Sequence, residues 1–429
     1  MATLSNNNIT LLQSRNIIFW LVAIVFLTLY NLTPSLNSYD TQYYILAGEH
    51  FWNGHIDCLR TPVYPLLLKC CQEIFGTNGM ANAITVLQSI VYIVSLVSLK
   101  RIAEQTIKNS SLSFVLLLFY VICIAPGWCN ELTTESLSIS GCVILANLVL
   151  SFLFRPKTKT NILIHITLVF LVFLRPTFII FFAILPAIWI YQTFKSPNKG
   201  HYVSATVLTI ICILCSGSYT LMYKNQYGTA NSTATFVFNK IYDAHRGGYW
   251  NPENVKNPEC RKWIDLIDAN YCGNYDIVYN TITQHPESMV LIDEGCNDII
   301  SAHKAEHQKY RAGLLVSSFD KRFLAAVNTH TKLSSVLFVS SLFLSFPLSL
   351  FYLIVSIAVI YLLFYILKKR SIPIVYFFIV ATIAAQTIGV ILTTSDAHER
   401  VLLPIYPLFI ILIGIIIDKL VAFPNNSSI

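Results

Sequence analysis

The chain has 429 residues, of which 55% are hydrophobic, 13% aromatic and only 12% charged. Soluble domains carry about 25% charged residues, so this composition excludes a string of soluble domains and requires much of the apolar surface to face lipid. The net charge is +7, from 29 basic and 22 acidic residues. Because the basic residues stand at the ends of apolar runs, they indicate membrane topology rather than nucleic-acid binding.

Long apolar runs predict about ten transmembrane helices, because a backbone in lipid must satisfy its own hydrogen bonds. The runs cover residues 17–33, 83–99, 112–126, 137–154, 162–174, 177–193, 203–222, 348–367, 372–391 and 401–421. Several are shorter than the ~20 residues that cross a hydrocarbon core, and 162–193 could be one long helix kinked at Arg175-Pro176. We expect an all-α polytopic membrane protein with an N-terminal transmembrane module, 1–223, and a C-terminal one, 333–429.

The positions of Lys and Arg between the runs predict the orientation. They are Arg15, Lys100, Arg101, Lys108, Arg155, Lys157, Lys159, Lys195, Lys199, Lys368, Lys369 and Arg370. With ten spans all of them fall on one side, which is the cytoplasmic one. The first apolar run carries no cleavage signal and is expected to be retained. The run 334–347 is interpreted as an interfacial or re-entrant helix, because a span there would put Lys368 outside.

The opposite, extracytoplasmic side receives a first loop, 34–82, and a long hydrophilic segment, 224–332. The long segment holds twelve of the 22 acidic residues, so we expect a small folded insert outside the membrane. Within it, Cys260 and Cys272 are candidates for a disulfide in an oxidising compartment. Spacing alone does not fix connectivity, and the pairing stays open.

The first external loop carries the most informative residues. Asp40 follows the first span closely, and Tyr43, Ala47 and Phe51 recur after it at helical spacing. Asp40 can therefore begin a surface-lying helix, where a carboxylate caps the helix and suits its dipole. Capping is the structural alternative to any catalytic role for Asp40.

Two motifs carry a resemblance to a known family. The loop contains Asp40-x-x-Tyr43-x-x-x-Ala47, then Gly54-x-x-Asp57, then Arg60-Thr61-Pro62-Val63-Tyr64-Pro65-Leu66-Leu67, and a late segment reads His398-Glu399-Arg400-Val401-Leu402-Leu403-Pro404-Ile405-Tyr406-Pro407. Together they resemble the GT-C superfamily of membrane glycosyltransferases, in the branch of dolichyl-phosphate-mannose protein mannosyltransferases and bacterial aminoarabinose transferases. Many relatives have glycine where this chain has Val63.

The resemblance implies transfer of a hexosyl or pentosyl group from a polyprenyl-phosphate donor to a glycan, lipid or protein acceptor. The reaction would occur at the extracytoplasmic face of the plasma (inner) membrane. Asp40 occupies the position of the catalytic carboxylate, which would take the proton of the acceptor hydroxyl. Arg60 and Arg400 would stabilise the departing lipid phosphate. Beside them, the resemblance places His398 at the donor site and Tyr43, Tyr64 and Glu399 along the substrate site.

Two further charged residues lie at the edges of predicted spans. The family often has an acidic residue in the second external loop, and we favour Glu135 over Glu131 as a catalytic residue there. Arg175 interrupts an apolar run, so we expect it to bind phosphate, with a structural ion pair as the alternative. His50, His55 and Asp57 have metal-ligand side chains but match no established spacing. The metal is therefore unknown, and a divalent cation stays open as a cofactor.

Two other classes of protein share some of these features. An envelope polysaccharide polymerase or ligase also has about ten spans and one large external loop, but it lacks an early Asp after the first span. A lipid or sugar transporter would show two related halves with charged or broken helices, and this sequence shows no such halves. Asp40 together with Arg60-Thr61-Pro62 favours the glycosyltransferase.

Overall fold

The computed structural model describes residues 6–31, 39–123, 126–231, 233–271, 273, 276–320, 348–369, 373–393 and 401–422. Across these ranges the secondary structure consists of α-helices and short 3-10 helices, without a strand. The structure thus confirms the expected all-α fold. Glu399, Arg400, His398, Cys272 and the run 334–347 lie outside the described residues.

Over its described residues, each of the ten apolar runs predicted from the sequence lies mostly on an α-helix. The helices are α1 (Asn6–Asn31), α3 (Val63–Thr106), α4 (Ser110–Cys123), α5 (Glu135–Phe154), α6 (Thr158–Leu174), α7 (Phe181–Lys195), α8 (Lys199–Tyr227), α15 (Leu348–Lys369), α16 (Ile374–Thr393) and α18 (Tyr406–Ala422). Among the described residues, five helical segments are long and apolar enough to cross a membrane. The chain is an integral membrane protein, and ten as the number of spans stays a prediction.

Two breaks in the helices differ from the expected boundaries. The helix α3 starts at Val63, about twenty residues before the predicted span, and bends at Gly76, whose φ of 72° favours glycine. The segment 162–193 is not one kinked helix. Arg175 is extended (φ −148°, ψ 125°), and the 3-10 helix η2 (Pro176–Ile180) separates α6 from α7. Proline at the first position of η2 disfavours helical backbone at the residue before it.

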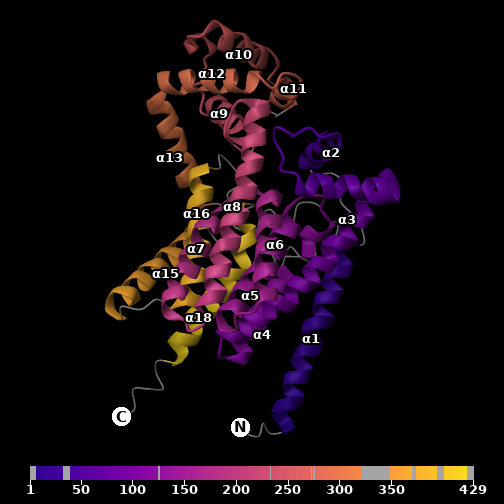
Figure 1. The fold of residues 1–429 in the computed structure, drawn as a ribbon, viewed down its shortest axis with the longest axis vertical. Helices are drawn as coiled ribbons and strands as arrows, with labels where there is room; N and C mark the ends of the chain where they lie inside the picture. The colour runs from indigo at the N-terminus through magenta and orange to yellow at the C-terminus, as the bar shows by residue number, and fades with distance from the viewer. Residues whose placement is uncertain are drawn as a thin grey trace.

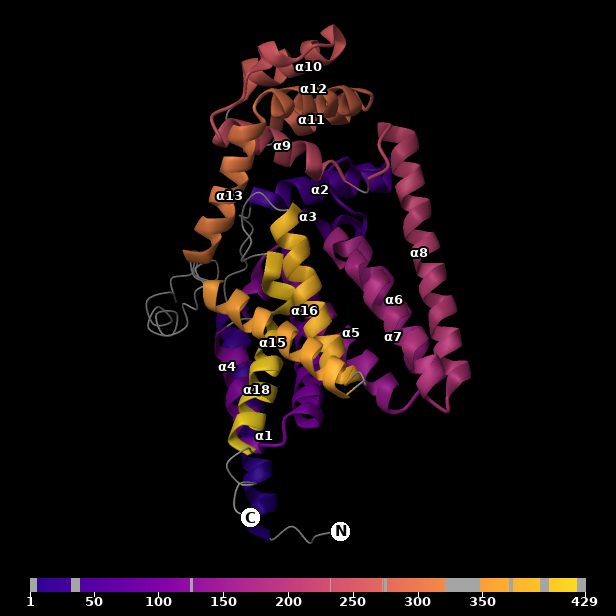
Figure 2. The same ribbon diagram turned by 90° about the vertical axis from the view of Figure 1, so that its left-hand side faces the viewer.

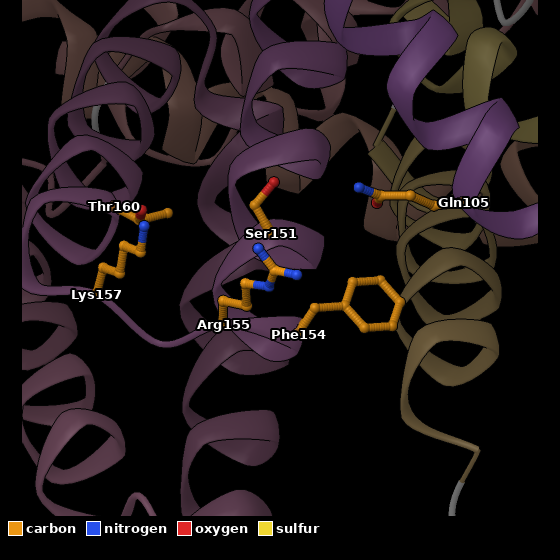
Figure 3. A pocket seen from close by; sticks show the side chains of 6 residues that line it. All are labelled: Gln105, Ser151, Phe154, Arg155, Lys157 and Thr160. Carbon is orange, nitrogen blue, oxygen red and sulfur yellow. The ribbon is translucent and has the colours of Figure 1, made fainter. Parts of the chain in front are cut away.

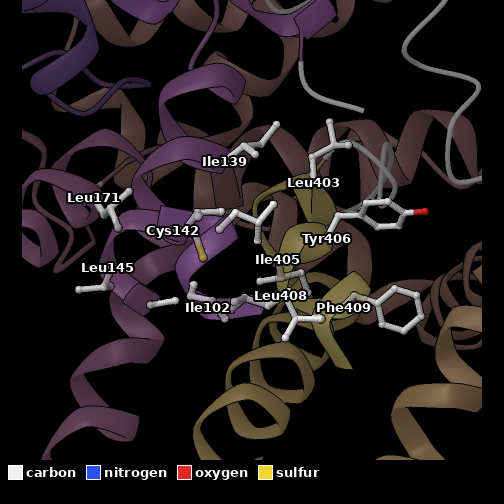
Figure 4. Packing of buried hydrophobic residues seen from close by; sticks show 14 of the residues in the cluster. Ile102, Ile139, Cys142, Leu145, Leu171, Leu403, Ile405, Tyr406, Leu408 and Phe409 are labelled. Carbon is white, nitrogen blue, oxygen red and sulfur yellow. The ribbon is translucent and has the colours of Figure 1, made fainter. Parts of the chain in front are cut away.

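The main hydrophobic core surrounds α5, most of whose side chains are buried. Small residues on α5 allow close packing: a Cβ at Gly141 would lie 2.7 Å from Leu171 of α6. The 3-10 helix η5 (Leu403–Ile405) and α18 cover the other side of α5 (Figure 4). The side chains that meet there include Ile139, Cys142, Leu403, Ile405 and Leu408.

The hydrophilic insert is helical and lies beyond one end of the bundle (Figure 1). It comprises α9 (Thr235–Arg246), η3 (Pro252–Asn254), α10 (Pro258–Asn270), α11 (Asp276–Gln284), α12 (Ser288–Ala302) and α13 (Lys304–Asp320). Local sequence explains its boundaries: Gly228 ends α8 with a φ of 75°, and Asn257 caps α10 ahead of Pro258. We call α9–α12 the cap.

The cap and the first external loop share a second hydrophobic core. Tyr43, Ile56, Cys58 and Leu59 from the loop pack with residues of α8 and of the cap helices. Figure 2 shows α2 (Tyr39–Trp52) lying across the end of the bundle, beneath α9. The surface-lying helix expected from the spacing after Asp40 is therefore present, and the cap rests on it.

Candidate functional site

Asp40, in the first turn of α2, forms an ion pair with Arg60, which lies in the loop after α2. Arg60 Nη2 lies 2.6 Å from Asp40 Oδ1, and both side chains are partly exposed, at 17% and 19%. The Arg60 guanidinium also stands over the ring of Tyr44, 4.3 Å from its centroid, and donates to the Tyr44 hydroxyl at 3.4 Å. Since Tyr44 follows Asp40 by one helical turn, both side chains lie on the same face of α2, and this face contacts Arg60.

Asp57 holds the backbone that carries Arg60. Its side chain is fully buried, and Oδ1 accepts the backbone N–H groups of Leu59 at 2.8 Å and Arg60 at 2.7 Å. Oδ2 accepts the hydroxyl of Tyr279 in α11 at 2.7 Å and bonds to Nδ1 of His50 in α2 at 2.9 Å. One carboxylate thus ties together the loop, the surface helix and the cap.

The residues considered as metal ligands therefore lie in different surroundings. His50 pairs with Asp57, while His55 is exposed to solvent. The hydrogen bond that His50 donates to Asp57 raises the pKa of His50 against the opposing effect of burial. Within the described ranges, no group of three or more His, Cys, Asp or Glu side chains is placed to hold a metal ion.

A second ion pair lies between the beginning of α5 and the break after α6. Glu135, in the first turn of α5, is fully buried, and its Oε1 is 3.7 Å from Nη1 of Arg175. The extended backbone of Arg175 places this side chain between α6 and η2. Glu131, in contrast, uses its backbone carbonyl to accept the amide of Gln88 at 2.9 Å.

Hydrogen bonds between neighbouring residues bring the two ion pairs together. Thr61, next to Arg60, donates to the carbonyl of Leu174, next to Arg175, at 3.2 Å. The hydroxyls of Tyr44 and Thr134 lie 3.4 Å apart. Asp40, Arg60, Glu135 and Arg175 are thereby gathered at the end of the bundle beneath the cap, although they come from three separate stretches of sequence.

Each arginine has one buried nitrogen that makes no hydrogen bond, although Nη1 of Arg175 is the atom that faces Glu135. Within the described part of the chain, the buried Nε of Arg60 and Nη1 of Arg175 have no hydrogen-bond partner. Burial works against the charge of Arg60, but Tyr44 and Asp40 raise its pKa above the ordinary value. Buried N–H groups of a fixed guanidinium suit an anion with several acceptor oxygens, such as a phosphate.

The two predicted tyrosines lie in different surroundings. Tyr43 points into the second core, with its hydroxyl bonded to Asp276 at the start of α11. Tyr64 is fully buried at the start of α3, and its hydroxyl donates to Gln88 at 3.3 Å. His398, Glu399 and Arg400 fall outside the described residues, and η5, which follows them, packs against α5.

Sequence reasoning missed Tyr44, Tyr279 and the structural role of Asp57. Tyr44 carried a usable signal, because it stands four residues after Asp40 and shares its helical face. Tyr279 carried none, since 222 residues separate it from Asp57.

The chain aligns with two solved structures of an oligosaccharyltransferase from Archaeoglobus fulgidus. One is AglB in complex with an inhibitory peptide and a dolichol-phosphate, with 11% identity, a TM-score of 0.48, and coverage of 97% of this chain and 52% of that one. The other is a complex with Zn and sulfate, with 12% identity, a TM-score of 0.44, and coverage of 95% and 51%. The present chain spans about half the length of these proteins. No protein-family model and no curated protein matches it.

Proposed function

We propose that this membrane protein is a glycosyltransferase that moves a hexosyl or pentosyl group from a polyprenyl-phosphate donor to an acceptor. The observation that carries the proposal is the convergence of Asp40, Arg60, Glu135 and Arg175 beneath the cap. Two guanidiniums, each with a buried nitrogen that makes no hydrogen bond, suit a phosphate, and a partly exposed carboxylate beside them suits proton transfer. The site faces the extracytoplasmic side of the plasma (inner) membrane.

In the reaction, a hydroxyl of the acceptor attacks the anomeric carbon of the donor sugar. Asp40 takes the hydroxyl proton while the bond between the anomeric carbon and the phosphate oxygen breaks, and the lipid phosphate leaves with the electron pair. Arg60 and Arg175 stabilise the charge that develops on that phosphate, with Arg400 and His398 as further donor-binding residues. A donor phosphate also competes with Asp40 for Arg60, which frees the carboxylate for the acceptor.

Glu135 positions Arg175 and is the second carboxylate of the site. Each of the two carboxylates faces an arginine, an arrangement that does not suit a divalent cation, so no step is assigned to a metal. Tyr43, Tyr64 and Glu399 remain proposed lining residues of the substrate site. The residues 1–223, 224–332 and 333–429 form the proposed N-terminal module, insert and C-terminal module.

The class of reaction is tested with purified full-length protein in detergent, given radiolabelled polyprenyl-phosphate sugars and glycan, lipid or peptide acceptors. We expect label to reach an acceptor without any nucleotide sugar. Absence of transfer from every polyprenyl-phosphate sugar, from protein that is monodisperse and folded, would contradict the proposal. Uptake of free sugar into vesicles without transfer would favour a transporter.

The role of Asp40 is tested with Asp40→Asn. The amide keeps the shape of the side chain and an oxygen for Arg60, but it is no longer a base. Turnover should fall by roughly 10²- to 10⁴-fold with expression unchanged. Glu49→Gln is the matched control, because Glu49 also lies on α2 and pairs with Lys69 of α3 at 2.6 Å. Equal activity of both variants would remove Asp40 from the chemistry.

A further inference from the structure

A cavity of about 710 Å³ lies at the end of the bundle opposite Asp40 and Glu135. The helix α5 begins at Glu135 and reaches the cavity with its last turn, ~30 Å away for twenty residues of α-helix. The cavity also touches the end of α3 and the start of α6 (Figure 3). Its lining residues are Gln105, Ser151, Phe154, Arg155, Lys157 and Thr160.

The lining carries two cations and no carboxylate. Neither the side chain of Arg155 nor that of Lys157 forms an ion pair or hydrogen bond within the described part of the chain. Figure 3 shows both side chains beside the hydroxyls of Ser151 and Thr160. Cations next to hydroxyl and amide donors form a typical environment for a phosphate group.

The start of α6 adds further donors to the same wall. Lys157 is the N-cap of α6 and makes no side-chain capping bond, and its carbonyl accepts only the N–H of Asn161. The N–H groups of the first turn, where Thr160 lies, therefore have no acceptor within the helix. Together with the dipole of α6, they favour an anion in the cavity.

The position of the cavity relative to the membrane suits a lipid. It lies where the apolar parts of α3, α5 and α6 end, and Phe154 at its rim is 54% exposed. This is the end of the bundle that the Lys and Arg residues mark as cytoplasmic, the side on which anionic lipids attract basic residues. A headgroup could enter the cavity while its acyl chains stay beside Phe154.

We propose that this cavity binds a phosphate group, carried by an anionic membrane lipid or by a small soluble phosphate, at a site separate from the one beneath the cap. Arg155 and Lys157 hold the phosphate by charge, and Ser151, Thr160 and the first turn of α6 donate hydrogen bonds to it. The site binds and releases this ligand without chemistry. It does not depend on the proposed glycosyltransferase activity.

The test measures binding to delipidated full-length protein by native mass spectrometry. Phosphatidylglycerol is the anionic lipid, phosphatidylcholine the zwitterionic one, and inorganic phosphate and glycerol phosphate are the soluble ligands. Each cation near an anionic headgroup contributes roughly a fivefold gain in affinity. The double variant Arg155→Gln/Lys157→Gln should therefore bind phosphatidylglycerol roughly 30-fold more weakly than the unchanged chain.

The matched control is Lys195→Gln/Lys199→Gln, which removes the same charge from the last residue of α7 and the first residue of α8, at the same end of the bundle. Both variants alter exposed residues, and size-exclusion elution checks their folding. Displacement of the lipid by glycerol phosphate, or binding of soluble phosphate alone, would support the phosphate site and identify its source. Equal loss of binding in both double variants, or no loss in either, would overturn the proposal.

Discussion

The carboxylate of Asp57 should control how often the loop bearing Arg60 opens. Asp57→Ala deprives the buried backbone N–H of Leu59, the partly buried N–H of Arg60 and the Tyr279 hydroxyl of their acceptor. An unsatisfied buried donor costs about 1–3 kcal/mol. Water can enter beside His50, which is 29% exposed, so the low end of that range applies to each donor and the total is about 3 kcal/mol.

The neighbouring Cys58 provides the assay. Its side chain is fully buried, whereas Cys70 on α3 is exposed. A maleimide therefore labels Cys70 even while the loop is closed, but it reaches Cys58 only when the loop opens locally. Peptide mass spectrometry over a time course gives both rates in one sample, with Cys70 as the internal standard. A loss of about 3 kcal/mol corresponds to roughly 100-fold faster labelling of Cys58.

Two variants complete this experiment. Tyr279→Phe removes one of the four bonds to Asp57 and should accelerate labelling of Cys58 only about fivefold, for a loss of about 1 kcal/mol. Asp265→Ala removes a carboxylate of the cap that only pairs with Arg261 in an exposed i,i+4 contact, and should have no effect. If Asp57→Ala labelled Cys58 at the wild-type rate, the carboxylate would not hold the loop.

Three further predictions concern the charged groups near the site. The hydrogen bond with Asp57 raises the pKa of His50 in the folded protein. The stability that this contact contributes is therefore fully present below the unfolded pKa of about 6.5, and it is lost as pH rises through the raised pKa of the folded protein. His50→Gln should abolish that part of the pH dependence of thermal unfolding. Glu135→Ala leaves Arg175 without its buried partner and should destabilise by about 3–5 kcal/mol in chemical denaturation, whereas a cost below about 1 kcal/mol would show the pair to be solvated. Arg60→Lys keeps the charge but loses the planar fork, so donor binding should weaken less than in Arg60→Ala; equal affinities of both variants and wild type would remove Arg60 from the donor site.

The helices were predictable because each satisfies its own backbone in lipid, so the apolar runs alone indicate where they lie. The bend at Gly76 and the break at Arg175 were harder. The sequence shows Arg175-Pro176, but a proline after a charged residue fits both a kinked helix and two separate helices. Only the packing of η2 between α6 and α7 decides between them.

From the sequence, only the predicted membrane topology indicated that the charged residues of the site would lie close together. The predicted topology puts Asp40 and Glu135 after different spans on one side of the membrane, so a shared face was expected, but no pattern indicated which cation pairs with which carboxylate. For Asp57 the sequence was misleading, because nearby His50 and His55 resemble metal ligands. Its actual partners include Tyr279, 222 residues away, and a contact at that separation leaves no local periodicity.

The shared core of cap and first loop also constrains how the chain matures during synthesis. Cys58 leaves the ribosome long before Tyr279 and the rest of α11, with a delay of roughly 10–45 s at 5–20 residues per second. For most of this interval the apolar side chains of Ile56 and Leu59 lack their partners on the cap helices. The newly made loop therefore keeps apolar side chains exposed until the insert has been synthesised. An insert produced by itself would expose the matching apolar surface and aggregate.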